Sequence, residues 1–179
     1  MMTLVTGGSA SGKSEYAENL AYTMHQENKN APFFYIATMQ AFDREAEEKI
    51  KRHREMRKHK GFTTIECFLG LKKLELPKES IVLLDCMSNL VANEMFDPKG
   101  AREHTVANVL EGIQRLLTSC HHVVVVTNEV FGEAGNYSEE TMQYVKFLGE
   151  INRQMAVLSQ KVVEVVYGIP VIHKQEERT

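Results

Sequence analysis

A stretch close to the N-terminus has the residue types and spacing of a phosphate-binding loop. Residues 7–14 read GGSASGKS and match the pattern G-x-x-x-x-G-K-[S/T]. Glycines let backbone N–H groups curl around a phosphate, and a helix that begins there adds positive potential. Lys13 would reach the β- and γ-phosphates as a catalytic cation, and the Ser14 hydroxyl would bind Mg²⁺. The predicted phosphate-binding residues are Gly7, Gly8, Ser9, Ala10, Ser11, Gly12, Lys13 and Ser14.

A carboxylate further along the chain fits the same chemistry. Asp85 ends the apolar run IVLLD at 81–85. In proteins with such a loop, a carboxylate at the end of a strand holds Mg²⁺ beside the phosphates. Any strand can end in Asp, so Asp85 by itself would predict little. The prediction depends on the phosphate loop that precedes it in the chain. We predict Asp85 and Ser14 as Mg²⁺ ligands.

One histidine lies on a regular stripe of a charged segment. Residues 43–60 read DREAEEKIKRHREMRKHK, with acids first and bases last, which suits the helix macrodipole. Ala46, Ile50, His53 and Arg57 recur at i, i+4, i+7 and i+11 and share one helix face. Because Ala46 and Ile50 are apolar, this face should be directed at the protein. The spacing alone is compatible with a structural histidine as well as a catalytic one.

Polar residues also follow the valine-rich run that ends near residue 127. Ligands of open α/β sheets bind at the carboxyl ends of the strands, so Glu129 is a candidate for the nucleotide site. A structural role in capping the next segment is the alternative. Glu129 and Asp43 are both candidates for the general base of a phosphoryl transfer, since each has a carboxylate near the expected site.

The elements that must position these residues alternate between short β-branched runs and helix-patterned stretches. Such alternation predicts an α/β fold, with a mostly parallel sheet flanked by helices. The predicted strands are 3–6, 33–38, 81–85, 123–127 and 162–166, with a short antiparallel edge strand at 171–172 after a turn at 168–170. The predicted helices are 13–25, 43–60, 88–96, 102–119 and 138–160. The tail from residue 174 is polar and should be frayed.

Length and composition limit the classes of protein that fit. The chain has 179 residues, enough for one domain, which we place at 1–174 with a polar tail at 175–179. A formal net charge of −3 argues against a nucleic-acid partner. The three cysteines form no C-x-x-C pair, which favours a reducing compartment. With no signal-like start and no apolar run near the roughly 20 residues of a membrane span, we expect a cytoplasmic protein.

Several stretches together resemble one enzyme family, the bifunctional adenosylcobinamide kinase/adenosylcobinamide-phosphate guanylyltransferase of cobalamin biosynthesis. Many families share the phosphate loop, but an early Y-I-A-T, an H-x-x-x-R helix and a late T-N-E-V are a much more specific combination. The matching residues span nearly the whole chain. They lie at 4–8, 11–14, 35–38, 83–86, 126–130 and 168–171, with Asp43, Glu45, Ile50, His53, Arg57, Asn93, Gly149, Ile151 and Asn152 among them.

The resemblance implies a RecA-like P-loop fold assembled as a homo-oligomer, commonly a trimer. It implies phosphorylation of the aminopropanol hydroxyl of adenosylcobinamide, a corrinoid, and then transfer of GMP from GTP to that phosphate. In the family GMP passes through a covalent guanylyl-histidine, and His53 is the matching position. The nucleotide substrates would be GTP and ATP, with Mg²⁺. Arg57, one turn beyond His53, would steady a phosphate or the histidine.

The sequence departs from the family at two places, and two other classes of protein stay open. Ala10 stands where the family commonly has Arg, and Phe131 interrupts a loop that usually continues with Gly. One alternative is a P-loop small-molecule kinase without guanylyl transfer, in which His53 is structural. The other is a RecA-like ATPase that binds nucleic acid or a protein through residues 49–60, although this segment has no interleaved aromatic residues.

Overall fold

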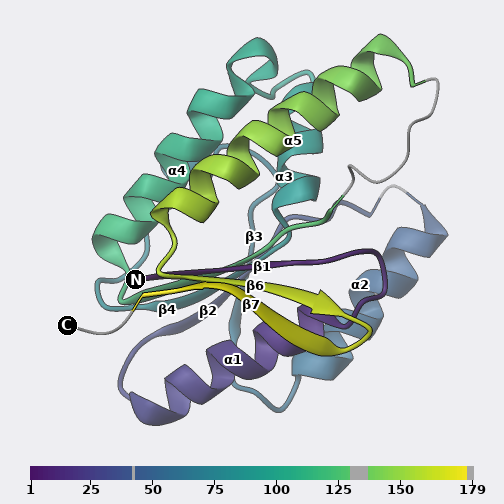
Figure 1. Cartoon of the computed structure of the whole chain (residues 1–179). Helices are drawn as coiled ribbons and strands as arrows, with labels where there is room; N and C mark the ends of the chain where they lie inside the picture. Colours follow the sequence, from purple (N-terminus) through teal and green to yellow (C-terminus); the bar gives the residue numbers. More distant parts are fainter. Residues whose placement is uncertain (42, 130–136, 177–179) are drawn as a thin grey trace.

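The computed structural model describes residues 1–41, 43–129 and 137–176, whose strands form one sheet (Figure 1). The strand order is β3-β2-β4-β5-β1-β6-β7. All the pairings are parallel except the one between β6 and β7. The strands are β1 (Met2–Thr6), β2 (Phe33–Ala37), β3 (Thr63–Glu66), β4 (Ile81–Asp85), β5 (His122–Val126), β6 (Lys161–Val166) and β7 (Ile169–Gln175).

Helices cover both faces of this sheet. The chain runs through α1 (Lys13–Glu27), α2 (Arg44–Arg57), α3 (Met87–Phe96), α4 (Thr105–Ser119) and α5 (Glu139–Leu158), with short 3₁₀ turns at Leu71–Lys73 and Arg102–His104. Figure 1 shows α3, α4 and α5 together on one side and α1 and α2 on the other. None of the described helices is both long and apolar enough to cross a membrane.

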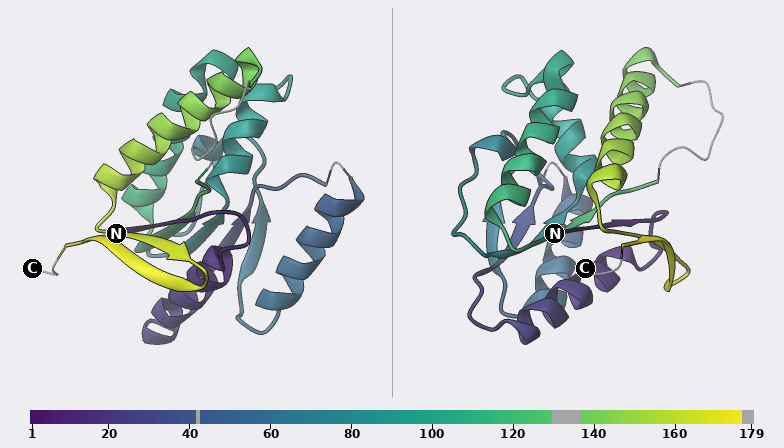
Figure 2. Two further views of the ribbon diagram at one scale, coloured as in Figure 1. Left: turned by 45° about the vertical axis from the view of Figure 1, so that its right-hand side comes forward. Right: turned by 60° about the vertical axis from the view of Figure 1, so that its left-hand side comes forward.

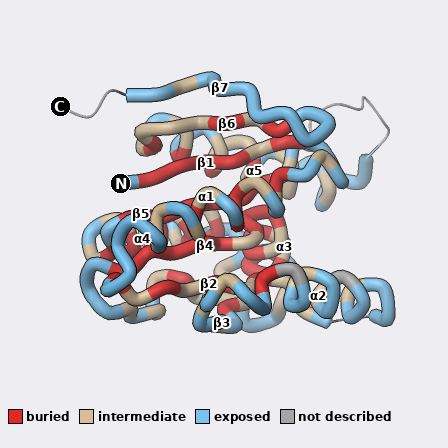
Figure 3. The backbone as a smooth tube through the Cα atoms, turned by 90° about the horizontal axis from the view of Figure 1, so that it is seen from below, coloured by how far each residue is buried: buried red, intermediate tan, exposed pale blue. Residues whose placement is uncertain are grey.

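The central strands are apolar on both faces because both faces are covered. Leu84 and Val125 point into the core beneath α3, α4 and α5, whereas Leu83 and Val124 point into the core beneath α1. Figure 3 shows β1 and β4 as buried stretches running through the middle of the molecule. Parallel strands covered in this way are expected to be continuously hydrophobic. The site residues at the ends of β1, β4 and β5 are therefore attached to the most buried part of the chain.

The α/β class and the mostly parallel sheet are confirmed, with corrections at the two sheet edges. The edge strand β3 was not predicted, because its short sequence TTIE is largely exposed and has no apolar run. At the other edge, β7 is longer than the predicted 171–172 and includes Ile169 and Pro170. The turn instead lies at Tyr167 and Gly168, both with positive φ. An edge strand tolerates Pro170, because one of its sides needs no partner strand (Figure 2).

The polar tail also begins later than predicted. Lys174 and Gln175 belong to β7, where Lys174 pairs with Val162 and Gln175 with Lys161. The Lys174 Nζ donates to the carbonyl of Val157 at 3.1 Å, which attaches this end of the strand to α5. Backbone pairing with β6 therefore orders residues that their polarity alone marked as frayed.

The segment just after α2 is attached to α1 by a buried ion pair. Lys60 Nζ lies 3.0 Å from Oε2 of Glu18, whose side chain is fully buried. The other oxygen, Oε1, has no hydrogen-bond partner among the described residues. Burial raises the pKa of Glu18, while the hydrogen bond from Lys60 lowers it. Lys60 therefore offsets part of the cost of burying the Glu18 carboxylate.

Replacing this cation should destabilise the fold in a pH-dependent way. In a Lys60→Met variant the buried carboxylate has no counter-ion, and we expect a loss of about 3 kcal/mol in the free energy of unfolding. A raised folded pKa means that stability falls as pH rises through it, so the loss should be larger at about pH 8 than at about pH 5. Urea unfolding at both pH values measures it. The exposed Lys58→Met is the control, and an equal loss at both pH values would contradict the role of Glu18.

Candidate functional site

A cavity of about 520 Å³ lies at the carboxyl end of the sheet and is lined by most of the predicted site residues. It is lined by residues from the loop after β1, from β2 and β4, from α2 and from the segment after β5. The predicted residues among them are Ser9, Ala10, Ser11, Gly12, Lys13, Ser14, His53, Arg57, Asp85 and Glu129. The hypothesis that these residues share one site, made from sequence spacing, therefore has a geometric basis.

Gly7 and Gly8 do not line the cavity but shape the loop beside it. Gly7 has φ +149°, and a Cβ there would lie 2.5 Å from the carbonyl oxygen of Val165, so no side chain fits. The carbonyl of Gly8 accepts a hydrogen bond from Lys13 Nζ at 2.8 Å. Gly12 has φ +92° and immediately precedes α1. Glycine adopts this left-handed conformation at low cost, which allows the helix N-terminus to open directly onto the loop.

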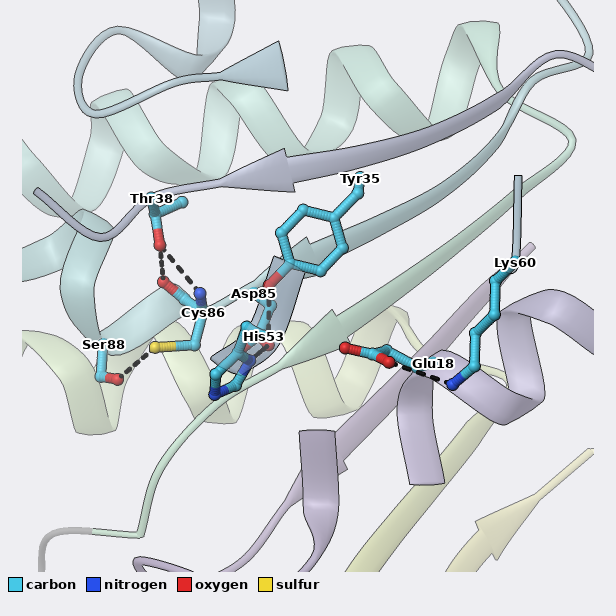
Figure 4. A network of polar contacts seen from close by, with 8 residues as sticks. All are labelled: Glu18, Tyr35, Thr38, His53, Lys60, Asp85, Cys86 and Ser88. Carbon is cyan, nitrogen blue, oxygen red and sulfur yellow. Dashed lines mark hydrogen bonds and ion pairs between the residues drawn. The ribbon is translucent and has the colours of Figure 1, made fainter. Parts of the chain in front are cut away.

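The Asp85 carboxylate contacts two side chains of the site (Figure 4). The Tyr35 hydroxyl donates to Asp85 Oδ2 at 3.0 Å, and His53 Nδ1 lies 3.5 Å from the same oxygen. Both side chains of the His53–Asp85 pair are largely buried. Burial, followed by the nearby Asp85 charge, raises the pKa of Tyr35 far above its ordinary value. The hydroxyl therefore stays protonated and can act as a donor to Asp85.

Arg57 is buried above the same tyrosine. Its guanidinium carbon lies 3.7 Å from the centroid of the Tyr35 ring, a cation–π arrangement. Arg57 forms no ion pair with any described carboxylate, although it lines the cavity. A buried cation without a carboxylate partner is suited to an anionic ligand. The shared stripe of His53 and Arg57 does face the protein, and Ile50 also lines the cavity.

Hydrogen bonds behind Asp85 join the ends of β2, β4 and β5. The Thr38 hydroxyl donates to the carbonyl of Cys86 at 2.8 Å and accepts from its N–H at 2.8 Å. The peptide bond between Asp85 and Cys86 is cis. Cys86 Sγ lies 3.0 Å from the Ser88 hydroxyl, which accepts from Asn128 Nδ2 at 2.6 Å. These contacts fix the backbone that carries Asp85.

The two candidate bases are placed differently. Asp43 is exposed and outside the cavity lining, and its Oδ1 accepts the N–H of Ala46 at 2.8 Å as the N-cap of α2. Glu129 lines the cavity, and its backbone N–H donates to the carbonyl of Gly7 at 3.2 Å. This bond holds Glu129 beside the phosphate loop. The predicted departure at Phe131 lies outside the described residues.

Sequence spacing missed Tyr35 and Thr38 as members of this site. Residues 35–38 contribute only to the resemblance to a family, and their spacing alone predicts no site residue. A signal was present: Tyr35 is the polar member of an apolar strand, and it shares the α1 face of the sheet with Leu83 and Val124. Its contact with Asp85 depends on β2 pairing with β4, which the local sequence does not reveal.

The residues present fit a Mg²⁺–nucleotide rather than a metal held by protein alone. Among the described residues, no group of three or more His, Cys, Asp or Glu side chains could hold a metal ion. Ser14 and Asp85 both line the cavity and offer oxygen ligands. Mg²⁺ is commonly bound by one or two protein oxygens together with phosphates and water.

Strand order, phosphate loop and cavity define a RecA-like P-loop nucleotide-binding protein. Solved structures of low identity share the fold. A KaiC-like protein from Pyrococcus horikoshii matches with a TM-score of 0.55 and 13% identity, covering 98% of this chain and 79% of that one. A second solved structure, an ATPase domain, matches with a TM-score of 0.54 and 10% identity, covering 99% of this chain and 78% of that one.

Sequence comparison identifies the family within this fold. Residues 3–172 match the family described as cobinamide kinase / cobinamide phosphate guanyltransferase, and the chain belongs to it. The bifunctional adenosylcobalamin biosynthesis protein CobU of Escherichia coli is 32% identical, with 96% of this chain and 98% of the relative covered. CobP of Pseudomonas aeruginosa, with the same description, is 28% identical, with 98% and 99% covered.

The cation of Arg57 should contribute to triphosphate binding. In an Arg57→Met variant we expect the affinity for Mg·GTP to fall about tenfold or more, because a hydrogen bond to a charged group contributes about 1.5–3 kcal/mol. Isothermal titration measures the dissociation constant. Arg44→Met on the exposed face of the same helix makes the same change of charge and is the control. Equal affinities of the Arg57 and Arg44 variants would show that Arg57 does not bind the nucleotide.

Proposed function

We propose that this protein phosphorylates adenosylcobinamide and then transfers GMP from GTP to adenosylcobinamide-phosphate, giving adenosylcobinamide-GDP in cobalamin biosynthesis. The family supports both activities as a class. The observation that carries the histidine mechanism is the position of His53 beside Asp85, within the cavity that also contains the phosphate loop. A histidine with a purely structural role on an exposed helix would have no reason to line this cavity, so the position of His53 favours a catalytic role.

The first half of guanylyl transfer would be an attack by His53 on the α-phosphorus of GTP. Nδ1 faces Asp85, which leaves Nε2 as the attacking nitrogen. A P–N bond forms and the bond to pyrophosphate breaks, so the nucleotide becomes a guanylyl-histidine. The Asp85 carboxylate stabilises the positive charge that develops on the imidazole. A covalent intermediate of this kind divides one difficult transfer into two easier steps.

In the second half, an oxygen of adenosylcobinamide-phosphate attacks the same phosphorus. The P–N bond breaks and its electron pair returns to Nε2, which restores His53. Lys13, the loop amides and Arg57 would stabilise the phosphate charge in both halves, which their position in the cavity lining supports. Ser14 and Asp85 would hold Mg²⁺, which neutralises charge on the phosphate oxygens when it is bound.

The kinase reaction would use the same loop with ATP or GTP as phosphoryl donor. Glu129 is the proposed general base, since its segment is hydrogen-bonded to the loop at Gly7 and its side chain lines the cavity. It would accept the proton of the aminopropanol hydroxyl as that oxygen attacks the γ-phosphorus. Asp43 is not retained for this role, because its carboxylate caps α2.

The homo-oligomer implied by the resemblance, a trimer, also belongs to the proposal. The β6–β7 hairpin lies at an edge of the sheet (Figure 2). It exposes several apolar side chains there, which supports the proposal of an interface between copies. They are Val166, Tyr167, Ile169, Val171 and Ile172.

A covalent adduct on His53 tests the guanylyl-transfer mechanism. Protein mixed with Mg²⁺ and GTP labelled at the α-phosphate, without corrinoid, should retain acid-labile, base-stable label. His53→Ala should retain none, whereas His59→Ala, an exposed histidine just beyond α2, should be labelled like the wild type. If Mg·GTP binds to the wild type but leaves no label, the protein is a P-loop kinase or ATPase in which His53 is structural.

The kinase step has its own test at Glu129. A Glu129→Gln variant should lower the kinase kcat about 100-fold, the smaller end of the usual contribution of a general base. Labelling of His53 should persist, because that step deprotonates no acceptor hydroxyl. Steady-state assay of adenosylcobinamide phosphorylation measures the effect, with the exposed Glu139→Gln as control. A kinase rate equal to that of the control would remove Glu129 from the mechanism.

A further inference from the structure

The Asp85 carboxylate has more partners in the proposed site than one of its oxygens can bind. Under the proposed function it faces the nucleophile and also binds Mg²⁺. The contacts with Tyr35 and His53 fall on the same atom, since Oδ2 accepts from Tyr35 Oη at 3.0 Å and lies 3.5 Å from His53 Nδ1. Neither of these two contacts uses Oδ1. The two oxygens of this carboxylate are therefore suited to different partners.

The Tyr35 contact is the tighter of the two. A separation of 3.0 Å is within the ordinary range of a hydrogen bond, whereas the 3.5 Å between His53 Nδ1 and Asp85 Oδ2 is beyond it and constrains direction less. Tyr35 comes from β2, whose backbone pairs with β4 up to Ala37 and Asp85. The donor and the acceptor are thus held on adjacent, buried strands. His53, by contrast, comes from α2, in which Arg57 is the only buried residue among the described side chains.

We propose that Tyr35 is a positioning residue for guanylyl transfer, an inference that rests on the proposed function. Its hydroxyl holds Asp85 Oδ2 toward His53 Nδ1, so that Nε2 would be directed at the α-phosphorus. Oδ1 takes part in neither contact and stays available to Mg²⁺ with or without the hydroxyl. Figure 4 shows Tyr35 reaching Asp85, with His53 on the same carboxylate. Without the hydroxyl, Oδ2 is no longer held toward His53 Nδ1, and the proposed nucleophile loses its fixed partner, while a carboxylate oxygen remains for Mg²⁺.

The ring and the hydroxyl of Tyr35 have separable roles. The ring supports the Arg57 guanidinium at 3.7 Å, while the hydroxyl contacts Asp85. Phenylalanine retains the ring, so a Tyr35→Phe variant removes only the hydrogen bond and keeps the platform for Arg57. The matched control is Tyr22→Phe in α1, a partly buried tyrosine for which the structure describes no side-chain hydrogen bond.

The experiment compares two reactions of the same protein. In Tyr35→Phe, the single-turnover rate constant for labelling His53 at saturating Mg·GTP should fall about tenfold, the usual effect of losing one hydrogen bond to a charged group. The dissociation constant of Mg·GTP should change less than about twofold, because the phosphate ligands are unchanged. The kinase kcat should stay within about threefold, because that reaction has no His53 step. Tyr22→Phe should leave all three quantities at their wild-type values.

A double-mutant comparison tests whether the hydroxyl acts through Asp85. In an Asp85→Asn background, the Tyr35→Phe change should have no further effect on the residual labelling rate, since its partner has lost its charge. Full additivity of the two changes would overturn the proposal. So would a labelling rate in Tyr35→Phe equal to that of the wild type, or an equal fall of labelling and kinase rates. A wild-type protein that is never labelled would instead refute the guanylyl-histidine mechanism itself.

Discussion

The rest of the site depends on one buried carboxylate at the end of β4, a strand in the interior of the sheet. The side chain of Asp85 is only 8% exposed, and a charge so placed must be compensated by its neighbours. Tyr35 arrives on β2, next to β4, and donates to Asp85, and His53 Nδ1 lies 3.5 Å from the same oxygen. On the other side of β4, the segment after β5 brings Glu129 into the same cavity. Strand order thereby gathers at one edge the residues that the proposed chemistry requires.

The helix that carries His53 is positioned by charge rather than by apolar burial. Among the described side chains, four polar or cation–π contacts attach the second half of α2, and the residues just beyond it, to the rest of the protein. They are Arg57 with the ring of Tyr35, His53 with Asp85, Arg54 with Glu66 and Lys60 with Glu18. Such an attachment depends on the protonation and charge of its partners, so we expect a substitution that removes one charge to alter the position of His53 as well as the stability of the fold.

Local signals were enough to predict the phosphate loop, the central strands and the stripe of His53 and Arg57. The loop is a contiguous pattern, and the strands are apolar because both of their faces are covered. Tyr35 and the Glu18–Lys60 pair could not be found in this way, since each contact joins distant segments through strand order or helix packing. The edge strands were predicted incompletely for a related reason. β3 and the ends of β7 are held by backbone pairing, which their exposed side chains do not reveal.

The proposed pair of reactions requires attack at two different phosphorus atoms of a triphosphate bound by one loop. Guanylyl transfer needs a nucleophile at the α-phosphorus, and the kinase step needs an acceptor at the γ-phosphorus. His53 enters the cavity from α2 over the end of β4, whereas Glu129 enters from the segment that is hydrogen-bonded to the loop at Gly7. The groups assigned to the two reactions therefore come from separate elements, while Lys13, Ser14 and Asp85 would be common to both. With separate approaches and shared ligands for the Mg²⁺–triphosphate, one cavity in a chain of 179 residues would serve both proposed transfers.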